Sequence, residues 1–217
     1  MKKRYDILEF ISQREDREMP RENENLVHVA NVIRRATEDC RENGEQSSPG
    51  YGYVVSDKEK REAERFAKET DRWIPISDIF ILGIPGPSGS ESDTYISQHG
   101  YIYKTNNLMH CKDSIMLALQ KYILYNLVFP DTAYTYVGFT GFDGRSIYPI
   151  VRQNYIKDCS PAMQNEIDCY MAAIGFEKIG KGRYENYFCT IWDVLPKNVL
   201  KDISGDIFVI DAEIELK

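Results

Sequence analysis

Apolar residues recur at helical spacing in the first third of the chain, which is otherwise dense in charge. Leu26, Val29 and Ile33 are spaced three to four positions apart, so residues 24–41 are predicted to form an amphipathic helix. A second helix is expected over residues 57–71. The segment between them, residues 43–52, is rich in Gly, Ser and Pro, which is typical of a loop. This part of the chain is therefore predicted to be a helical extension that packs through one apolar stripe.

After residue 73 the pattern changes to short apolar runs that are separated by glycine and other turn residues, which is typical of strands and hairpins. The predicted strands are residues 79–84, 94–97, 101–105, 134–139, 147–151, 199–200 and 207–210, with further strands within 176–191. The turns predicted between strands are residues 98–100, 141–144 and 180–182.

Two helices are predicted among these strands. Residues 113–127 carry an apolar stripe that includes Met116, Leu119 and Ile123. A second helix is expected from Ser160, which is suited to the N-cap with proline in the first turn, to residue 174, with glycine ending it. The order strands, helix, strands, helix, strands predicts an α+β fold in two layers.

Composition and charge restrict the function further. The chain has 217 residues, of which 42% are hydrophobic, so it can bury a core. The formal charge of −7 disfavours a broad footprint on nucleic acid, and no nucleic-acid partner is expected, although a small basic pocket remains compatible. No apolar run is long enough to cross a membrane, and the first residues do not resemble a signal peptide. A cytoplasmic location without membrane contact is therefore expected.

Cysteine and histidine give little indication of a site. The five cysteines are odd in number and form no CxxC pair, which argues against a disulfide framework or a zinc site. The three histidines are widely spaced, so a histidine-centred metal site or a Ser-His-Asp hydrolase is poorly supported.

The first candidate for chemistry is the glycine-rich stretch over residues 83–92, which contains Gly86, Gly89 and Ser90. Glycines let a backbone approach a phosphate closely and expose its N–H groups to anionic oxygens. A plain hairpin turn is the alternative. The stretch also lacks the GK[ST] ending of a P-loop and is not predicted to lead into a helix.

The second candidate is Lys104, in the predicted strand Tyr101-Ile-Tyr-Lys104. A strand lysine that faces the same cleft as a glycine loop can pair with nucleotide phosphates. The alternative is a lysine at a strand end that extends its ammonium group to water.

The third candidate is formed by Asp193, Asn198 and Asp211. Asp193 and Asn198 are five positions apart, the spacing of a kinase catalytic loop, and Asp211 ends a predicted strand 13 positions further on. A loop followed by a hairpin can bring these side chains together. The alternative is that Asp, Pro and Asn are present only because they favour a turn.

Residues 193–200, DVLPKNVL, resemble the DLKPENLL-type catalytic loop of protein kinase-like enzymes, and the later VID resembles the strand that ends in their magnesium-binding aspartate. Together with GPSGSESDTYIS and YIYK, they resemble the small kinase domains found in polyvalent proteins of phages and conjugative elements. The resemblance extends over about residues 73–217. It implies a phosphate loop at Gly86, Gly89 and Ser90, an ATP-phosphate lysine at Lys104, a catalytic Asp193, and magnesium ligands Asn198 and Asp211.

The chain also departs from this family pattern. Ile191-Trp192 replace the usual His-Arg before the catalytic aspartate, and Ala212-Glu213 replace Phe-Gly after the metal-binding one. The helix that should offer a glutamate to Lys104 contains none, so Asp113 or Gln120 substitutes for it, or the lysine has no such partner.

The sequence thus predicts a two-lobed protein kinase-like fold with a reduced C-terminal lobe. The expected divisions are a helical extension over residues 1–75, an N-lobe over 76–156 and a C-lobe over 157–217. The expected activity is ATP- and magnesium-dependent phosphate transfer to a hydroxyl of an unknown protein or small-molecule acceptor. The alternative is an inactive nucleotide-binding or interaction module with the same fold. An acidic protein that acts on a partner through charge alone is the weakest hypothesis.

Overall fold

The computed structural model describes residues 6–12, 19–43, 51–142 and 146–217. The chain divides into two compact units that do not follow chain order. The first unit comprises residues 21–120 and 134–154, and the second comprises residues up to 20, 121–133 and 155–217. Helices and strands occur in both units and every strand pair is antiparallel, in agreement with the predicted α+β class.

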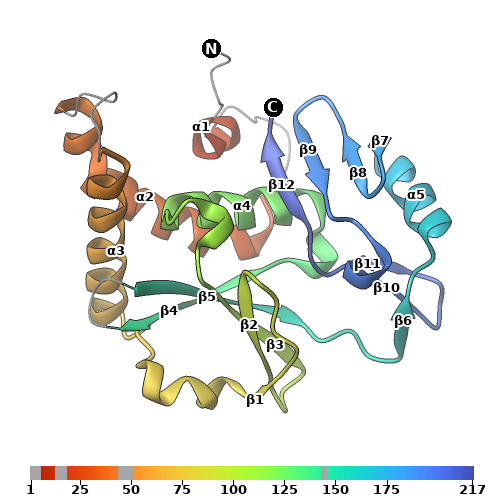
Figure 1. Cartoon of the computed structure of the whole chain (residues 1–217), viewed down its shortest axis with the longest axis horizontal. Helices are drawn as coiled ribbons and strands as arrows, with labels where there is room; N and C mark the ends of the chain where they lie inside the picture. Colours follow the sequence, from red (N-terminus) through yellow and green to blue (C-terminus); the bar gives the residue numbers. More distant parts are fainter. Residues whose placement is uncertain (1–5, 13–18, 44–50, 143–145) are drawn as a thin grey trace. The chain divides into compact units, whose positions relative to one another are not determined.

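A five-stranded sheet forms the centre of the first unit, in the order β1-β2-β3-β5-β4. Its strands are β1 (Ile84–Pro85), β2 (Ser92–Ile96), β3 (Tyr101–Asn106), β4 (Thr135–Phe142) and β5 (Ser146–Asn154). Two helices, α2 (Arg21–Asn43) and α3 (Tyr51–Glu69), pack against β4, as Figure 1 shows. The helices predicted as a separate extension therefore share a unit with the sheet.

Helix α2 forms where the apolar spacing predicts it, and Leu26, Val29 and Ile33 are all buried. Helix α3 begins six residues earlier than expected, at Tyr51. Most of the predicted loop between the two helices, residues 44–50, lies outside the described residues, as does the turn tip at 143–145.

Polar as well as apolar residues of α3 are buried, which the apolar stripe did not predict. The Glu59 carboxylate accepts hydrogen bonds from the Ser114 hydroxyl at 2.8 Å and from the Met116 N–H at 3.2 Å. Lys60 forms an ion pair with Asp113 at 2.6 Å. These contacts fasten α3 to the start of α4 (Ile115–Val128). The burial of Glu59 and Lys60 is thus compensated by polar partners.

The prediction of a strand at residues 79–84 is wrong. Residues Ile76–Leu82 form a 3-10 helix, η1, and only Ile84–Pro85 pair with β2. The burial pattern explains the difference, because Ile79 and Leu82 are buried whereas Phe80 and Ile81 are exposed. A spacing of three between buried positions suits a 3-10 helix, in which residues i and i+3 lie on the same side.

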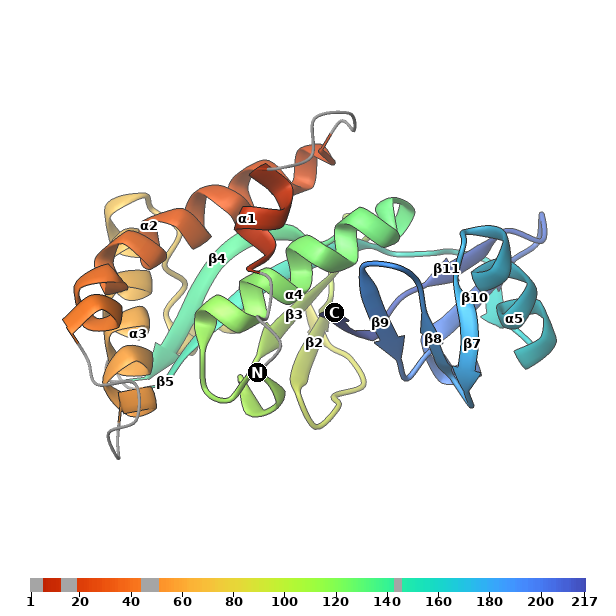
Figure 2. The same ribbon diagram turned by 90° about the horizontal axis from the view of Figure 1, so that it is seen from above.

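The second unit contains two smaller sheets, in the orders β11-β10-β6 and β12-β9-β8-β7. Their strands are β6 (Cys159–Pro161), β7 (Glu177–Gly180), β8 (Arg183–Glu185), β9 (Cys189–Trp192), β10 (Val199–Asp202), β11 (Ile207–Val209) and β12 (Glu213–Leu216). Helix α5 (Gln164–Ala173) lies beside β7 (Figure 2), and the unit also contains the short helix α1 (Ile7–Ser12). The strands predicted at the C-terminal end of the chain, with their turn at residues 180–182, are confirmed.

The predicted helix start at Ser160 is also wrong. Ser160 and Pro161 belong to β6 and pair with Lys201 and Leu200 of β10. Because β6 is an edge strand, the proline does not interrupt a ladder on its other side. Helix α5 begins only at Gln164, where the Glu166 carboxylate accepts a hydrogen bond from the N–H of the N-cap residue, Met163. Its end at glycine is confirmed.

Helix α4 contributes its first turns to the first unit and its residues from Lys121 on to the second. The predicted stripe of Met116, Leu119 and Ile123 is buried, and so are Tyr122, Leu124 and Tyr125. The helix is thus buried on more than the one face that its apolar stripe indicated. Among the described residues, no helix is long and apolar enough to cross a membrane.

Candidate active site

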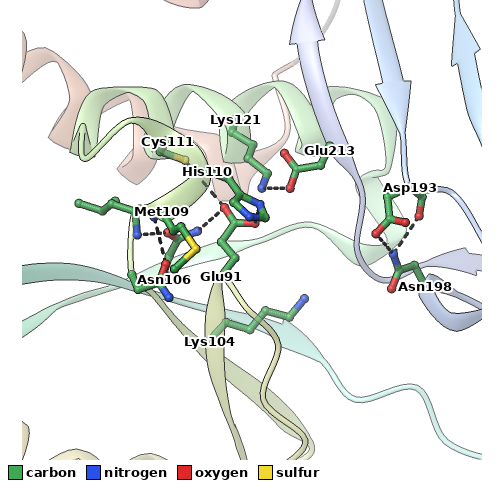
Figure 3. Close-up of polar contacts among 12 residues, drawn as sticks. Glu91, Lys104, Asn106, Met109, His110, Cys111, Lys121, Asp193, Asn198 and Glu213 are labelled. Carbon is green, nitrogen blue, oxygen red and sulfur yellow. Dashed lines mark hydrogen bonds and ion pairs between the residues drawn. The ribbon is translucent and has the colours of Figure 1, made fainter.

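Asp193 and Asn198 are in direct contact in the second unit. The Asn198 Nδ2 group donates to the main-chain oxygen of Asp193 at 2.8 Å and to its carboxylate Oδ2 at 2.9 Å (Figure 3). Asp193 follows β9 in a left-handed conformation, with φ of 61°. A single 3-10 turn, η4 (Pro196–Asn198), then reverses the chain. The loop geometry therefore places the two predicted residues together.

The loop that carries Asp193 is supported by the turn between β7 and β8. The Val194 N–H donates to the Gly182 carbonyl at 3.1 Å, and Val194 is fully buried. Gly182 has a φ of 61°, and a Cβ at this position would come within 2.7 Å of the Leu195 side chain. Sequence reasoning treated Gly182 only as a turn residue, but it also makes room for the candidate catalytic loop.

A cation accompanies the Asp193 carboxylate. The Lys197 Nζ lies 2.9 Å from Asp193 Oδ2, and the lysine side chain is 65% exposed. An exposed pair of this kind contributes only about 0–1 kcal/mol to stability. Its consequence is therefore local, because it places a positive charge beside the candidate catalytic carboxylate.

Asp211 follows β11 and lies close to Asn198 along the backbone. The N–H of the preceding residue, Ile210, donates to the Asn198 carbonyl at 2.9 Å, which continues the register that pairs Val199 with Val209. Asp211 is exposed. The pairing of β10 with β11 thus places the backbone of Ile210, the residue before Asp211, opposite Asn198.

Lys104 lies in the first unit, in the middle of the sheet, where it pairs with Thr94 of β2 and Val151 of β5. Its ammonium group is 3.1 Å from the Tyr134 hydroxyl and 5.1 Å from the centre of that ring. Tyr134 is buried. This contact orients the lysine side chain, and sequence reasoning did not identify it.

The glycine-rich stretch forms the hairpin between β1 and β2. The Gly86 N–H donates to the Thr94 carbonyl and the Gly89 N–H to the Ser92 carbonyl, so both glycine amides serve the hairpin itself. A Cβ on Gly86 would lie 2.8 Å from the Thr94 hydroxyl, whereas one on Gly89 would meet no atom within 4 Å. The fold therefore constrains Gly86 sterically and leaves Gly89 unconstrained.

Glu91 anchors the end of this loop, a role that the sequence analysis missed. Its carboxylate accepts a hydrogen bond from the Asn106 side chain at 2.9 Å and lies 3.6 Å from His110 Nδ1. Asn107 strengthens the attachment, because its side chain donates to the Ser90 carbonyl at 2.8 Å. Two successive asparagines at the end of β3 were the available sequence signal.

Asp113, one of the two residues considered as a partner for Lys104, is bound elsewhere. Its carboxylate contacts Lys60 at 2.6 Å and the Ser56 hydroxyl at 3.1 Å, both from α3. It also precedes α4 and has a φ of 60°. Helix α4 itself has no glutamate.

An open cleft of about 970 Å³ lies between α5 and the β10–β11 hairpin. It is lined by Glu166, Lys201, Tyr170 and Phe208 among others, and includes none of the predicted site residues. Hydrogen bonds from Lys201 and from the Met163 N–H hold the pKa of Glu166 below its usual value. The cleft is therefore distinct from the cluster around Asp193.

The comparisons with known proteins give one match. The family model described as "Serine/Threonine/Tyrosine Kinase found in polyvalent proteins" matches residues 56–217, which is well over half of the chain. No curated protein and no solved structure matches the chain. The matched range includes all of the candidate site residues and begins within α3.

Proposed function

The chain belongs to the family of serine/threonine/tyrosine kinases found in polyvalent proteins, and we propose that it transfers the γ-phosphate of ATP, with Mg²⁺, to a hydroxyl of a protein or small-molecule acceptor. The observation that carries the proposal is the contact of Asn198 with Asp193, and it is supported by the hydrogen bond from the N–H of Ile210, the residue before Asp211, to the Asn198 carbonyl. A simple turn would account for the contact of Asn198 with Asp193, but it would not require the hydrogen bond from Ile210 to Asn198.

The donor set of the hairpin fits a magnesium ion. Mg²⁺ prefers hard oxygen ligands, usually one or two carboxylates together with phosphate oxygens and water. Because Asn198 directs its Nδ2 group at Asp193, the amide oxygen points away from that residue and can serve as a ligand. Asp211 is exposed and lies two residues after Val209, the last residue of β11. We therefore assign Asn198 and Asp211 as the metal ligands.

In the proposed reaction the Asp193 carboxylate accepts a hydrogen bond from the acceptor hydroxyl, orients it, and takes its proton. The hydroxyl oxygen bonds to the γ-phosphorus as the bond from that phosphorus to the β-phosphate oxygen breaks and ADP leaves. Asn198 holds Asp193 through two hydrogen bonds, and Lys197 supplies a positive charge beside it. When bound, Mg²⁺ neutralises charge on the phosphate oxygens.

We assign the phosphate contacts to Lys104 and to the glycine-rich hairpin. Lys104, oriented by Tyr134, would pair its ammonium group with phosphate oxygens. The open space beside Gly89 leaves room for a phosphate to approach the loop. Because the amides of Gly86 and Gly89 already donate within the hairpin, we assign the polar contacts of the loop to Ser90 and its neighbours.

A nucleotide-binding module without transfer activity is the second candidate. It is favoured by helix α4, which departs from the kinase pattern in having no glutamate, and by the engagement of Asp113 with Lys60. Retention of Asp193, Asn198 and Asp211 favours the enzyme.

Calorimetric binding of Mg-ATP, measured beside phosphate transfer from γ-labelled ATP to protein and small hydroxyl acceptors, tests the proposal. Lys104→Met should abolish or greatly weaken binding. Lys112→Met is the matched control, because Lys112 is an exposed lysine of the same unit, and its binding should equal that of the wild type. Binding without turnover in the wild type would select the second candidate. A folded wild type that binds no Mg-ATP would refute both.

A further inference from the structure

The segment that carries Asp211 is held on both sides by residues of one helix and the turn after it. We propose that Tyr125 and Lys121 of α4, together with Thr132, are positioning residues that fix Asp211 for metal binding. This inference rests on the proposed function, because it assumes that Asp211 is a metal ligand. The three residues belong to the second unit, as Asp211 does.

The first contact is made two residues before Asp211. The Tyr125 hydroxyl and the Thr132 hydroxyl both donate to the main-chain oxygen of Val209, at 2.5 and 2.6 Å, and the two hydroxyls lie 3.1 Å apart. Tyr125, Thr132 and Val209 are all buried. Two buried hydroxyls thus converge on a single carbonyl, and few alternative arrangements satisfy all three groups.

The sheet explains why this carbonyl needs side-chain donors. Strand β11 is the edge of its sheet, and the N–H of Ile210 is directed at Asn198, toward β10. Since consecutive residues of a strand alternate their hydrogen-bonding direction, the carbonyl of Val209 faces the free edge. The hydroxyls of Tyr125 and Thr132 therefore supply the hydrogen bonds that a neighbouring strand would otherwise donate to this carbonyl.

The second contact is made two residues after Asp211. Lys121 and Glu213 form an ion pair at 2.9 Å, with side chains only 12% and 23% exposed (Figure 3). Glu213 opens β12 and is paired in register with Trp192 of β9, the residue directly before Asp193. The ion pair thus holds Glu213, which lies two residues after Asp211 and pairs with the residue that precedes Asp193.

The two contacts share one face of the helix. Lys121 and Tyr125 are four residues apart in α4, so they lie one above the other on the same side. Tyr125 contacts Val209, two residues before Asp211, and Lys121 contacts Glu213, two residues after it. Contacts on both sides restrict the backbone from which the Asp211 carboxylate extends, and groups that orient a ligand in this way tune its affinity for a metal.

The test uses a double variant that removes both donors to Val209 and nearly preserves side-chain volume, Tyr125→Phe with Thr132→Val. Mn²⁺ binding in the presence of a non-hydrolysable ATP analogue is followed by the electron paramagnetic resonance of free Mn²⁺. Binding of the analogue without metal is measured by calorimetry, and the melting temperature is recorded. Restoring a hydroxyl, in Tyr125→Phe with Thr132→Ser, should recover part of any loss.

Tyr184→Phe is the matched control. Tyr184 is an equally buried tyrosine of the same unit, and its hydroxyl donates to Asp168, in α5. We expect the double variant to weaken Mn²⁺ binding by about 10- to 100-fold, the usual effect of removing outer groups at a metal site, while binding of the metal-free analogue stays unchanged. The control should lower the melting temperature and leave Mn²⁺ affinity as in the wild type.

A double variant with a lowered melting temperature but wild-type Mn²⁺ affinity would overturn the inference, because the cluster would then be structural only. If the double variant does not fold, Thr132→Val alone and Lys121→Met are measured in the same way, and unchanged Mn²⁺ affinity in both would also overturn it. Failure of the proposed function is distinguishable, since it would appear in the wild type as absence of nucleotide or Mn²⁺ binding.

Discussion

The side chain of Asn198 donates two hydrogen bonds to Asp193, one to the main-chain oxygen at 2.8 Å and one to the carboxylate at 2.9 Å. The two residues are separated by one 3-10 turn that begins at Pro196. Proline fixes its own φ and is favoured at the start of such a turn, so the Asp-x-x-Pro-x-Asn spacing encodes the contact locally. The residue that would bind metal thereby also orients the residue that would accept the proton.

Replacing the proposed base should separate binding from catalysis. Asp193→Asn is expected to leave ATP affinity nearly unchanged and to lower phosphate transfer by roughly 10²- to 10⁴-fold, the range for a positioned general base. The amide can still accept from Asn198 through its oxygen, so the loop should keep its shape. The measurement is transfer of labelled γ-phosphate beside calorimetric ATP binding at one magnesium concentration. Full turnover in the variant would show that Asp193 is only a turn residue.

Removing Asp211, the second proposed metal ligand, should reduce the magnesium dependence of ATP binding. Mg-ATP is expected to raise the melting temperature of the wild type, because a ligand selective for the native state stabilises it. In Asp211→Ala the magnesium-dependent part of this increase should fall. Asp206→Ala is the control, since Asp206 is an exposed aspartate of the same hairpin. Equal magnesium dependence in the two variants would place the metal site elsewhere.

The two glycines of the hairpin between β1 and β2 should respond differently to alanine. Gly89→Ala meets no neighbouring atom within 4 Å, so the melting temperature should change little, while nucleotide binding should weaken several-fold if a phosphate occupies that space. Gly86→Ala brings a Cβ to 2.8 Å from the Thr94 hydroxyl and should lower the melting temperature. Calorimetry and thermal unfolding of both variants check this. Unchanged nucleotide affinity in Gly89→Ala would remove this loop from the binding site.

Features that depend on local spacing were predictable from the sequence. The buried stripe of α2 follows from the helical recurrence of Leu26, Val29 and Ile33, and the end of α5 follows from its glycine. The β10–β11 hairpin follows from two short apolar runs around a turn. Each of these depends on interactions within a few residues, which a single sequence contains.

Features decided by packing partners distant in sequence were not predictable. The apolar run at residues 79–84 fits a strand or a helix, and the burial of Ile79 and Leu82 selected the 3-10 form. Ser160 and Pro161 resemble a helix start, but pairing with β10 takes them into a strand. Likewise, nothing near Tyr125 in the sequence indicates that its hydroxyl is directed at Val209. Such contacts join segments that lie tens of residues apart.

A final prediction concerns the stability of the second unit in acid. Desolvation acts to raise the pKa of Asp168, but hydrogen bonds from Lys178, Tyr184 and Gln164 outweigh it and hold that pKa below its usual value. A carboxyl group whose pKa is lower in the folded state stabilises the fold at pH values above its unfolded pKa of about 3.9. That stabilisation is lost as the pH falls through the folded pKa.

Asp168→Asn should therefore lower the melting temperature at neutral pH and reduce its decline below about pH 4, because the variant has no carboxylate to protonate there. Tyr184→Phe removes one of the three donors and should give an intermediate decline. Thermal unfolding followed by circular dichroism from pH 7 to pH 3 measures both. If Asp168→Asn and the wild type lose stability in parallel over this range, the hydrogen bonds to Asp168 do not account for the acid sensitivity of this unit.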